Sequence, residues 1–294
     1  MAGITAQLIK ELRDKTNAGM MDCKGALTEA NGDLEEAETI LRKKGILKAG
    51  KKASREVKEG LIDAHIDTEG RVGSLIEVNC ETDFVAKNEN FVGFVNELSA
   101  HIAKNGGDAT SVEELEGQAY GDSSFGETLK AKIAEVGENL VVKRFARYAV
   151  EGGSQGVIAQ YIHLAGKVGV LLEVGCDKAE TNGSDRFREV VKDVTLHIAA
   201  ASPICISRDE VDPALVAKER EVYAEQMKGK PENIIDKIVS GKIDKYFSTV
   251  ALLEQGFIKD PDQSVADLLG KVGGELGDTL VVRRFTRFAV GEAS

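Results

Sequence analysis

Apolar positions in the N-terminal region recur with the period of an α-helix and are interrupted by turn-forming residues. Thr5 is placed to cap a first helix. Asp33 and Glu36 form a capping-box pattern for a third helix, which Gly45 is expected to end. The apolar stripes are Leu8 and Leu12, then Cys23, Ala26, Leu27 and Ala30, then Ala37, Ile40 and Leu41. The pattern predicts three short helices, followed by a charged linker.

An internal repeat organises the chain from Gly60 onward. The segment GLIDAHIDTEGRVGSLIEVNC begins at Gly60 and matches GVIAQYIHLAGKVGVLLEVGC, which begins at Gly156, at a constant offset of 156 − 60 = 96 residues. Each copy predicts two β-strands joined by a Gly-containing turn and followed by a helix. A second pair, GENLVVKRFARYAV from Gly137 and GDTLVVRRFTRFAV from Gly277, alternates apolar residues with Lys or Arg. This alternation predicts a half-exposed strand that closes each copy.

The second copy is longer than the first. Its closing segment is displaced by 277 − 137 = 140 residues, so 140 − 96 = 44 extra residues fall between about Pro203 and Asp260. Asp212 followed by Pro213 is typical of a helix start, and Gly229-Lys230-Pro231 is typical of a turn between helices. We expect a hairpin of two antiparallel helices, with a narrow apolar seam, inserted into the second copy.

Composition narrows the possible functions. The formal net charge of −11 should repel nucleic acid and anionic membranes, because proteins that bind through phosphate contacts usually carry the opposite charge. The N-terminal residues lack the apolar run of a signal peptide, and no segment approaches the length of a membrane span. The four cysteines are widely spaced, which favours buried reduced thiols over disulfides or a zinc site. We expect a cytoplasmic protein that binds no membrane and no nucleic acid directly.

No catalytic motif accounts for the chain. It lacks a G-x-x-x-x-G-K-[ST] phosphate loop, a G-x-S-x-G nucleophile elbow and an H-E-x-x-H metal pair. Its four histidines are isolated in the sequence, and His101 and His197 occupy equivalent helical positions in the two copies. That equivalence favours a shared packing or helix-end role over catalysis. We expect no enzymatic activity, no metal and no cofactor.

Two short segments are unusual for purely structural elements. Met20 and Met21 begin a helix, and adjacent helical residues point about 100° apart, so we expect one of them in the core and one exposed. Thr82–Asn88 follows the second strand of the first copy, but the matching Lys178–Thr181 differs in sequence. Two interpretations remain open for this loop: an ordinary helix cap, with Thr82 or Asp83 as the capping residue and Phe84 in the core, or a segment that binds a partner.

Three stretches carry a resemblance to a known family. KTNAGMMDCKGALTEANGDLEEA, EVNCETDFVAKNENF and KPENIIDKIVSGKIDKYFSTVALLEQGFIKDP resemble the bacterial elongation factor Ts family, and the similarity runs over essentially the whole chain. It implies an α+β fold. The implied parts are a three-helix ubiquitin-associated-like module at 1–53, an α+β core subdomain with an antiparallel sheet at 54–152, and a second such subdomain at 153–294 that is interrupted by an antiparallel helical hairpin at about 208–255.

The resemblance also implies a partner. Members of the family act as guanine-nucleotide exchange factors in translation elongation: they bind elongation factor Tu, a GTPase that delivers aminoacyl-tRNA, in its nucleotide-free and GDP-bound forms and speed GDP release. The similarity at Phe257 and Ile258, near the hairpin, is weaker. The implied contacts with elongation factor Tu are Met20, Met21, Lys24, Thr82, Asp83, Phe84, Val85, Val136, Gly137 and His163.

A mechanism for such a factor follows from linkage. The factor must bind the nucleotide-free GTPase more tightly than the nucleotide-bound form, because otherwise it shifts no equilibrium. Phe84 is bulky and rigid, so it is the candidate for insertion between partner helices near the Mg²⁺ and phosphates. Asp83 is the candidate for positioning it through a charge-assisted hydrogen bond. This mechanism requires no covalent step.

Two other functions fit parts of the sequence. The Lys- and Arg-rich closing strands suggest an RNA-binding, ribosome-associated factor, but the net charge and the lack of an aromatic stacking platform argue against it. The N-terminal helices alone suggest a ubiquitin-like adaptor. That function leaves the duplicated core unexplained.

Overall fold

The computed structural model describes residues 4–16, 18–107, 109–227 and 231–292. The chain forms two compact units, and each is described by itself. The first contains the residues up to Asp63, Ile76–Phe145 and the C-terminal residues from Val290, and the second contains Ala64–Leu75 and Ala146–Ala289. Helices combine with antiparallel sheets, so the predicted α+β class is confirmed. The predicted domain limits stay a prediction.

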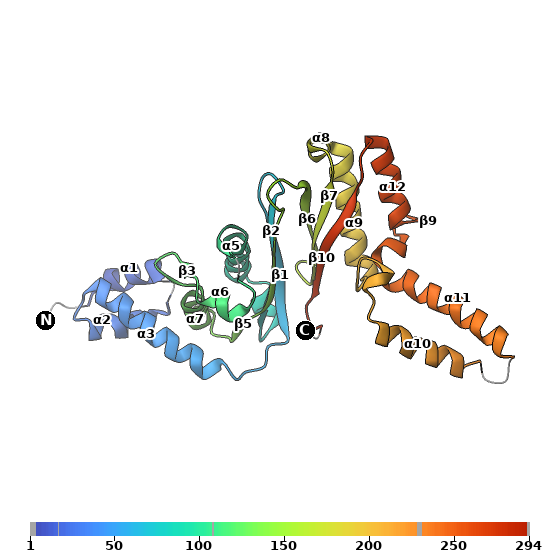
Figure 1. Ribbon diagram of the computed structural model, residues 1–294. Helices are drawn as coiled ribbons and strands as arrows, with labels where there is room; N and C mark the ends of the chain where they lie inside the picture. The colour runs from blue at the N-terminus through green and yellow to red at the C-terminus, as the bar shows by residue number, and fades with distance from the viewer. Residues whose placement is uncertain (1–3, 17, 108, 228–230, 293–294) are drawn as a thin grey trace. The chain divides into compact units, whose positions relative to one another are not determined.

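Three helices form the N-terminal module, as predicted (blue in Figure 1). Their bounds are α1 Ala6–Thr16, α2 Met20–Glu29 and α3 Leu34–Lys52. Thr5 caps α1, and its Oγ1 accepts a hydrogen bond of 3.2 Å from Leu8 N. Asp33 caps α3 by accepting from Glu36 N at 2.8 Å. The core of the module draws on all three predicted stripes: Leu12, Cys23, Ala26, Leu27, Ala30 and Ala37.

The third helix continues beyond Gly45, so the predicted end is wrong. Gly45 and Ala49 are buried, and α3 packs on α7 (Phe125–Val136). A Cβ atom at Gly45 would lie 3.4 Å from the Cβ of Ala134, so the glycine allows the two helices to approach closely. This packing outweighs the roughly 1 kcal/mol that a glycine costs inside a helix. The charged linker is correspondingly shorter and begins at Ala53.

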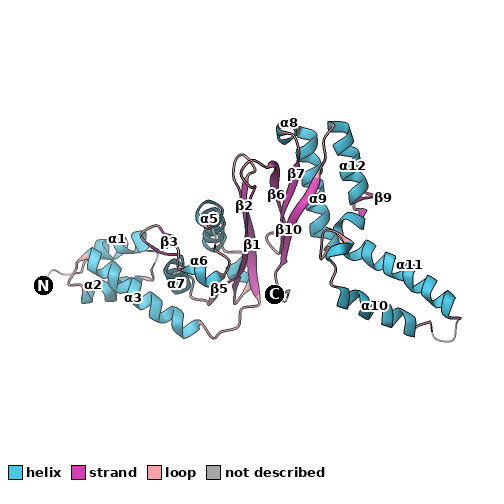
Figure 2. Cartoon of the chain, in the orientation of Figure 1, coloured by secondary structure: helices cyan, strands magenta, loops and turns pink. Residues whose placement is uncertain are grey.

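The first unit also contains the greater part of the sheet β1-β2-β5, whose residues within Ala64–Leu75 and after Phe145 are grouped with the second unit. Helices α5 and α7 of this unit are drawn in Figure 2. They supply much of its apolar core, in which Phe91 and Phe125 are fully buried. The bounds are β1 Glu59–Ile66, β2 Val72–Cys80, α4 Asp83–Ala86, α5 Glu89–Asn105, α6 Val112–Glu116, β3 Ala119–Tyr120, β4 Ser123–Ser124 and β5 Leu140–Ala149.

The second unit is built around the antiparallel sheet β10-β7-β6. Helix α9 packs on β6 and β7 and against α12, and these elements share one apolar core (Figure 1). The bounds are β6 Gln155–His163, β7 Val168–Cys176, α8 Ala179–Asn182, α9 Asp185–Ala201, β8 Gly256–Phe257, β9 Asp260–Ser264, α12 Val265–Leu276 and β10 Val281–Ala289.

The two units repeat one arrangement. In each, two strands, a one-turn helix and a long helix are followed by a short β-hairpin, a Ser-capped helix and the closing strand. The caps obey the second offset, because Ser124 and Ser264 are 264 − 124 = 140 residues apart and each completes a capping box. The predicted strands and long helices are confirmed. The one-turn helices and the Ser-capped helices were not predicted.

A helical hairpin is inserted into the second unit, as predicted, and extends away from its sheet (Figure 1). α10 spans Pro213–Glu225 and α11 spans Glu232–Val250. Asp212 caps α10 by accepting a hydrogen bond of 2.8 Å from Ala214 N. Most of the predicted turn between the helices, including Gly229, lies outside the described residues.

The base of the hairpin is tied to the second unit. Two short 3₁₀ helices, η1 (Arg208–Glu210) and η2 (Leu252–Glu254), lie there. The Arg208 guanidinium pairs with Glu254 at 2.6 Å and lies 4.7 Å from the centre of the Phe247 ring. Leu252 is fully buried in the main core of the unit. The start of α10 and the end of α11 are therefore held to the second unit by these contacts.

All four cysteines are buried thiols, as expected. Burial raises the pKa of the Cys23, Cys176 and Cys205 thiols, which keeps them protonated and unreactive. In the part of the chain that the structure describes, no helix is long and apolar enough to cross a membrane.

Candidate functional site

The turn after β2 presents Phe84 to solvent. Thr82 caps α4, and its Oγ1 accepts a hydrogen bond of 3.4 Å from Val85 N. Val85 and Ala86 pack against the core, whereas the Phe84 side chain is 82% exposed. Because successive helical residues point about 100° apart, a helix with Val85 and Ala86 inward turns Phe84 outward. The interpretation that placed Phe84 in the core is therefore wrong, and Thr82 is confirmed as a cap.

An ion pair lies beside Phe84 on the same short helix. Lys87 Nζ is 2.7 Å from Asp83 Oδ2, one helical turn away, and both side chains are exposed. The hydrogen bond from Lys87 to Asp83 raises the pKa of Lys87. Water screens such an exposed pair, so a partner group can compete for either charge.

A carboxylate from another part of the chain holds this turn. α7 ends at Val136, and Gly137 follows with a φ of 88°, a left-handed conformation that glycine adopts without strain. The next residue, Glu138, accepts hydrogen bonds from Glu81 N at 3.1 Å, from Thr82 N at 3.0 Å and from Thr82 Oγ1 at 2.6 Å. The structure thus brings two of the predicted contact segments together.

Glu138 was missed in the sequence analysis. Its hydrogen-bond partners lie 57 and 56 residues earlier in the chain, beyond the reach of local patterns. A signal exists nevertheless, because both closing segments carry an acidic residue at the same place, Glu138 in GENL and Asp278 in GDTL. An acid kept in both copies beside a turn is typical of a shared hydrogen-bonding role.

The helical module carries a separate exposed surface. Met20 is 59% exposed and Met21 is 76% exposed, and Lys24 is exposed one turn later on α2. The expectation that one methionine lies in the core is wrong, because α2 buries its other side through Cys23 and Leu27. Two flexible, polarisable side chains in water form an adaptable surface for a partner.

His163 lies in the second unit, at the exposed end of β6. Its ring stacks on Tyr161, with 5.7 Å between ring centres, and Nδ1 is 3.0 Å from the Tyr161 hydroxyl. In the following turn, Leu164 is 65% exposed and has a φ of 50°. Of the two weaker matches near the hairpin, Phe257 is buried and Ile258 is exposed.

The two equivalent histidines have packing roles, as favoured. His197 is buried, with Nε2 2.9 Å from Gln255 Oε1 and Nδ1 accepting from Ile258 N at 3.1 Å. The His101 ring packs on Tyr120 at 4.6 Å. Burial lowers the pKa of both histidines. Among the described residues, no group of three or more His, Cys, Asp or Glu side chains is arranged to hold a metal ion.

The basic residues of the closing strands pair with buried carboxylates. In the first unit, Arg144 Nε is 2.6 Å from the fully buried Glu77 carboxylate. In the second unit, Arg283 and Arg284 both reach the buried Glu173, at 3.1 Å and 2.7 Å. A bulge in β10 allows these two successive arginines to approach one carboxylate. Much of the positive charge of these strands is thus used within the fold.

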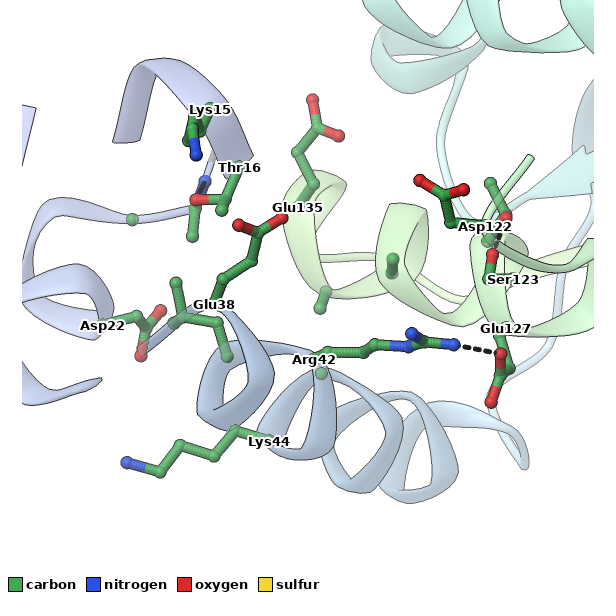
Figure 3. Close-up of a pocket in the computed structure, with 17 residues that line it drawn as sticks. Lys15, Thr16, Asp22, Glu38, Arg42, Lys44, Asp122, Ser123, Glu127 and Glu135 are labelled. Carbon is green, nitrogen blue, oxygen red and sulfur yellow. Dashed lines mark hydrogen bonds and ion pairs between the residues drawn. The ribbon is translucent and has the colours of Figure 1, made fainter. Parts of the chain in front are cut away.

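A cavity of about 330 Å³ lies between the helical module and α7 (Figure 3). Charged side chains of both signs surround it, and an ion pair between Arg42 of α3 and Glu127 of α7 lies at its edge. Of the described residues that line this cavity, none belongs to the predicted contact set. The candidate site is the exposed turn around Phe84 and not this cavity.

Comparison with known proteins gives a consistent result. The family model for elongation factor TS matches residues 81–292. An elongation factor Ts from Clostridium perfringens is 44% identical over 292 residues, which cover 98% of this chain and 93% of the relative. A second, from Trichlorobacter lovleyi, is 42% identical over 294 residues with the same coverage. The similarity includes both units and the helical module.

Proposed function

The chain belongs to the elongation factor Ts family, and we propose that it is a guanine-nucleotide exchange factor that binds elongation factor Tu and promotes its release of GDP. The observation that carries the proposal is the 82% exposure of Phe84 on a turn held by hydrogen bonds. An exposed aromatic ring that the fold does not need is suited to insertion into a partner.

The contact surface in this proposal has three parts. The first is the turn, with Thr82, Asp83, Phe84 and Val85, together with Val136 and Gly137 beside it. The second is the methionine surface of α2, with Met20, Met21 and Lys24, and the third is His163. In support, Phe84, both methionines, Lys24, Gly137 and His163 are exposed to solvent.

The proposed mechanism is a thermodynamic competition. Elongation factor Tu holds GDP mainly through its phosphates and Mg²⁺, so a side chain inserted near them can weaken GDP binding without touching the guanine. The chain must then bind the nucleotide-free GTPase more tightly, and GDP must weaken the binding of the chain by the same factor. Phe84 is the inserted side chain in this proposal, and no bond is made or broken by the chain itself.

The RNA-binding alternative has little support. The net charge is −11, and the arginines that suggested it, Arg144, Arg283 and Arg284, pair with buried glutamates. A surface of this kind offers few phosphate contacts.

The proposal is tested by the release of a fluorescent GDP analogue from elongation factor Tu. Adding the chain should raise the release rate in proportion to its concentration until saturation. Calorimetry of the chain alone with GDP and Mg²⁺ is the control, and it should show no binding, because the sequence has no phosphate loop. A release rate that does not change on adding the chain would contradict the proposal.

A further inference from the structure

We propose that Glu138 is a positioning residue for nucleotide exchange, whose carboxylate holds the Thr82–Ala86 turn so that Phe84 is presented to the partner in one orientation. The inference rests on the proposed function, because it takes Phe84 as the residue that enters elongation factor Tu. Glu138 is only partly exposed and is assigned no contact with the partner.

The hydrogen bonds form a short relay from Glu138 to α4. The Thr82 hydroxyl donates a hydrogen bond of 2.6 Å to Glu138 Oε1. This leaves the lone pairs of Thr82 Oγ1 free to accept a hydrogen bond of 3.4 Å from Val85 N. The other carboxylate oxygen accepts from the main-chain N–H groups of Glu81 and Thr82. The cap of the helix that carries Phe84 therefore depends on Glu138.

The two segments also hold each other in the opposite direction. Glu81 Oε1 accepts a hydrogen bond of 2.6 Å from Asn139 N, while Glu138 accepts from Glu81 N. Adjacent residues of each segment are thus tied to adjacent residues of the other. A ring on such a turn loses little freedom on binding, whereas a ring on a loose turn must be ordered at a cost.

The second unit contains a similar acid-held turn without the aromatic ring, although its helix cap, Lys178, makes no side-chain hydrogen bond to α8. Asp278 stands 278 − 138 = 140 residues after Glu138 and accepts from Asp177 N at 3.0 Å and Lys178 N at 3.1 Å. Asp278 also accepts from the hydroxyl of Thr181, which matches Val85 and not Thr82 (181 − 96 = 85), and these bonds lower the pKa of Asp278 to about 2. Where the first turn presents Phe84, this turn presents Glu180, which is exposed (180 − 84 = 96). The second unit therefore supplies a matched control.

The test compares Glu138→Ala with Asp278→Ala in the full chain. Both changes remove three or more hydrogen bonds from equivalent turns, and melting measures the loss of stability in each. At saturating factor, Glu138→Ala should lower the maximal rate of GDP release by about tenfold, while Asp278→Ala should stay within about twofold of the unchanged chain. Glu138→Gln keeps one acceptor oxygen, so its rate of GDP release should lie between those of Glu138→Ala and the unchanged chain. If Glu138→Ala folds poorly, Glu138→Gln takes its place in the comparison.

A double variant separates positioning from a general loss of structure. If Glu138 acts through Phe84, adding Glu138→Ala to Phe84→Ala should lower the release rate by no more than about twofold further. If the double variant lost the full product of the two single fold-losses in release rate, the positioning role would be overturned. A folded Glu138→Ala chain with an unchanged release rate would overturn it as well.

Amide hydrogen exchange of the factor alone gives a readout that does not need the partner. The Val85 amide should exchange faster in Glu138→Ala than in the unchanged chain, and at the unchanged rate in Asp278→Ala. Equal protection of this amide in all three chains would overturn the inference. If the unchanged chain does not accelerate GDP release, the proposed function fails, and the role in exchange fails with it. If the unchanged chain is active and only the Glu138 result is negative, the positioning role alone fails.

Discussion

Phe84 and Phe91 lie close in sequence and have opposite surroundings. The Phe84 side chain is 82% exposed, whereas Phe91 of α5 is fully buried in the core of the first unit. Phe84→Ala should therefore lower the free energy of unfolding by less than about 1 kcal/mol, because no packing is lost. Phe91→Ala, the matched control, should cost about 3–5 kcal/mol.

Denaturant titration of the two variants checks this contrast. A loss of several kcal/mol in Phe84→Ala would show that the ring supports the fold, and its assignment to binding would then be wrong.

His197 makes stability depend on pH. Its pKa is lowered below the ordinary 6.5 by burial, so between the two values the unfolded chain binds a proton that the folded protein does not. The free energy of unfolding should therefore increase as the pH rises toward about 6.5. As the pH falls below that value, proton binding to His197 in the unfolded chain lowers the stability of the fold. His197→Gln should show a shallower pH dependence below about pH 6.5 in denaturant titrations. His101, whose pKa is also lowered, contributes equally to the unchanged chain and to His197→Gln. If the free energy of unfolding varied with pH equally in these two chains, the pH dependence could not be assigned to His197.

At single residues, comparing the two copies predicted more than local pattern did. Phe84 was identified because the matching Glu180 differs while the surrounding scaffold agrees. The prediction for Met20 and Met21 was right for the exposed methionine and wrong for the one placed in the core. The size of a side chain does not reveal that smaller residues already fill the core of the module. Glu138 was missed because its role depends on a contact between segments that are far apart in sequence.

The elements divide into those set by their own sequence and those set by packing. Caps such as Thr5, Asp33 and Asp212 act on neighbouring residues and were predicted correctly. The end of α3 was not, because its length is decided by contacts with α7. The short helix α4 offers too few residues for any periodicity, and only its cap was visible.

The hairpin is expected to be separable from the second unit, within limits that the structure sets. Replacing residues 212–245 by a short Gly-containing linker keeps the Arg208–Glu254 ion pair and the buried Leu252. The melting temperature should then stay within about 5 °C, since a surface insertion contributes little to the core. A deletion extended to Leu253 removes Leu252 and should cost about 2–5 kcal/mol.

Calorimetric or spectroscopic melting of both deletions gives the answer. Loss of a cooperative transition in the shorter deletion would show that the hairpin helices are part of the fold of the unit.

For the whole molecule, the fold supplies one scaffold twice and a different turn on each copy. The shared features are the strands, the buried glutamates with their arginines, the Ser-capped helices and the acidic residue that holds the turn. Repeat offsets predicted the strands and the inserted hairpin. The pairing of charges inside the units was not visible, because an alternating strand of Arg and apolar residues does not show where its charges go.

The central claim is that the chain releases GDP from elongation factor Tu through Phe84. The most direct test is the maximal rate of fluorescent GDP release at saturating factor, measured for the unchanged chain, Phe84→Ala and the matched control Glu180→Ala. We predict that the unchanged chain and Glu180→Ala accelerate release equally and that Phe84→Ala, although folded, is slower by about tenfold or more. A folded Phe84→Ala chain that releases GDP as fast as the unchanged chain would contradict the account.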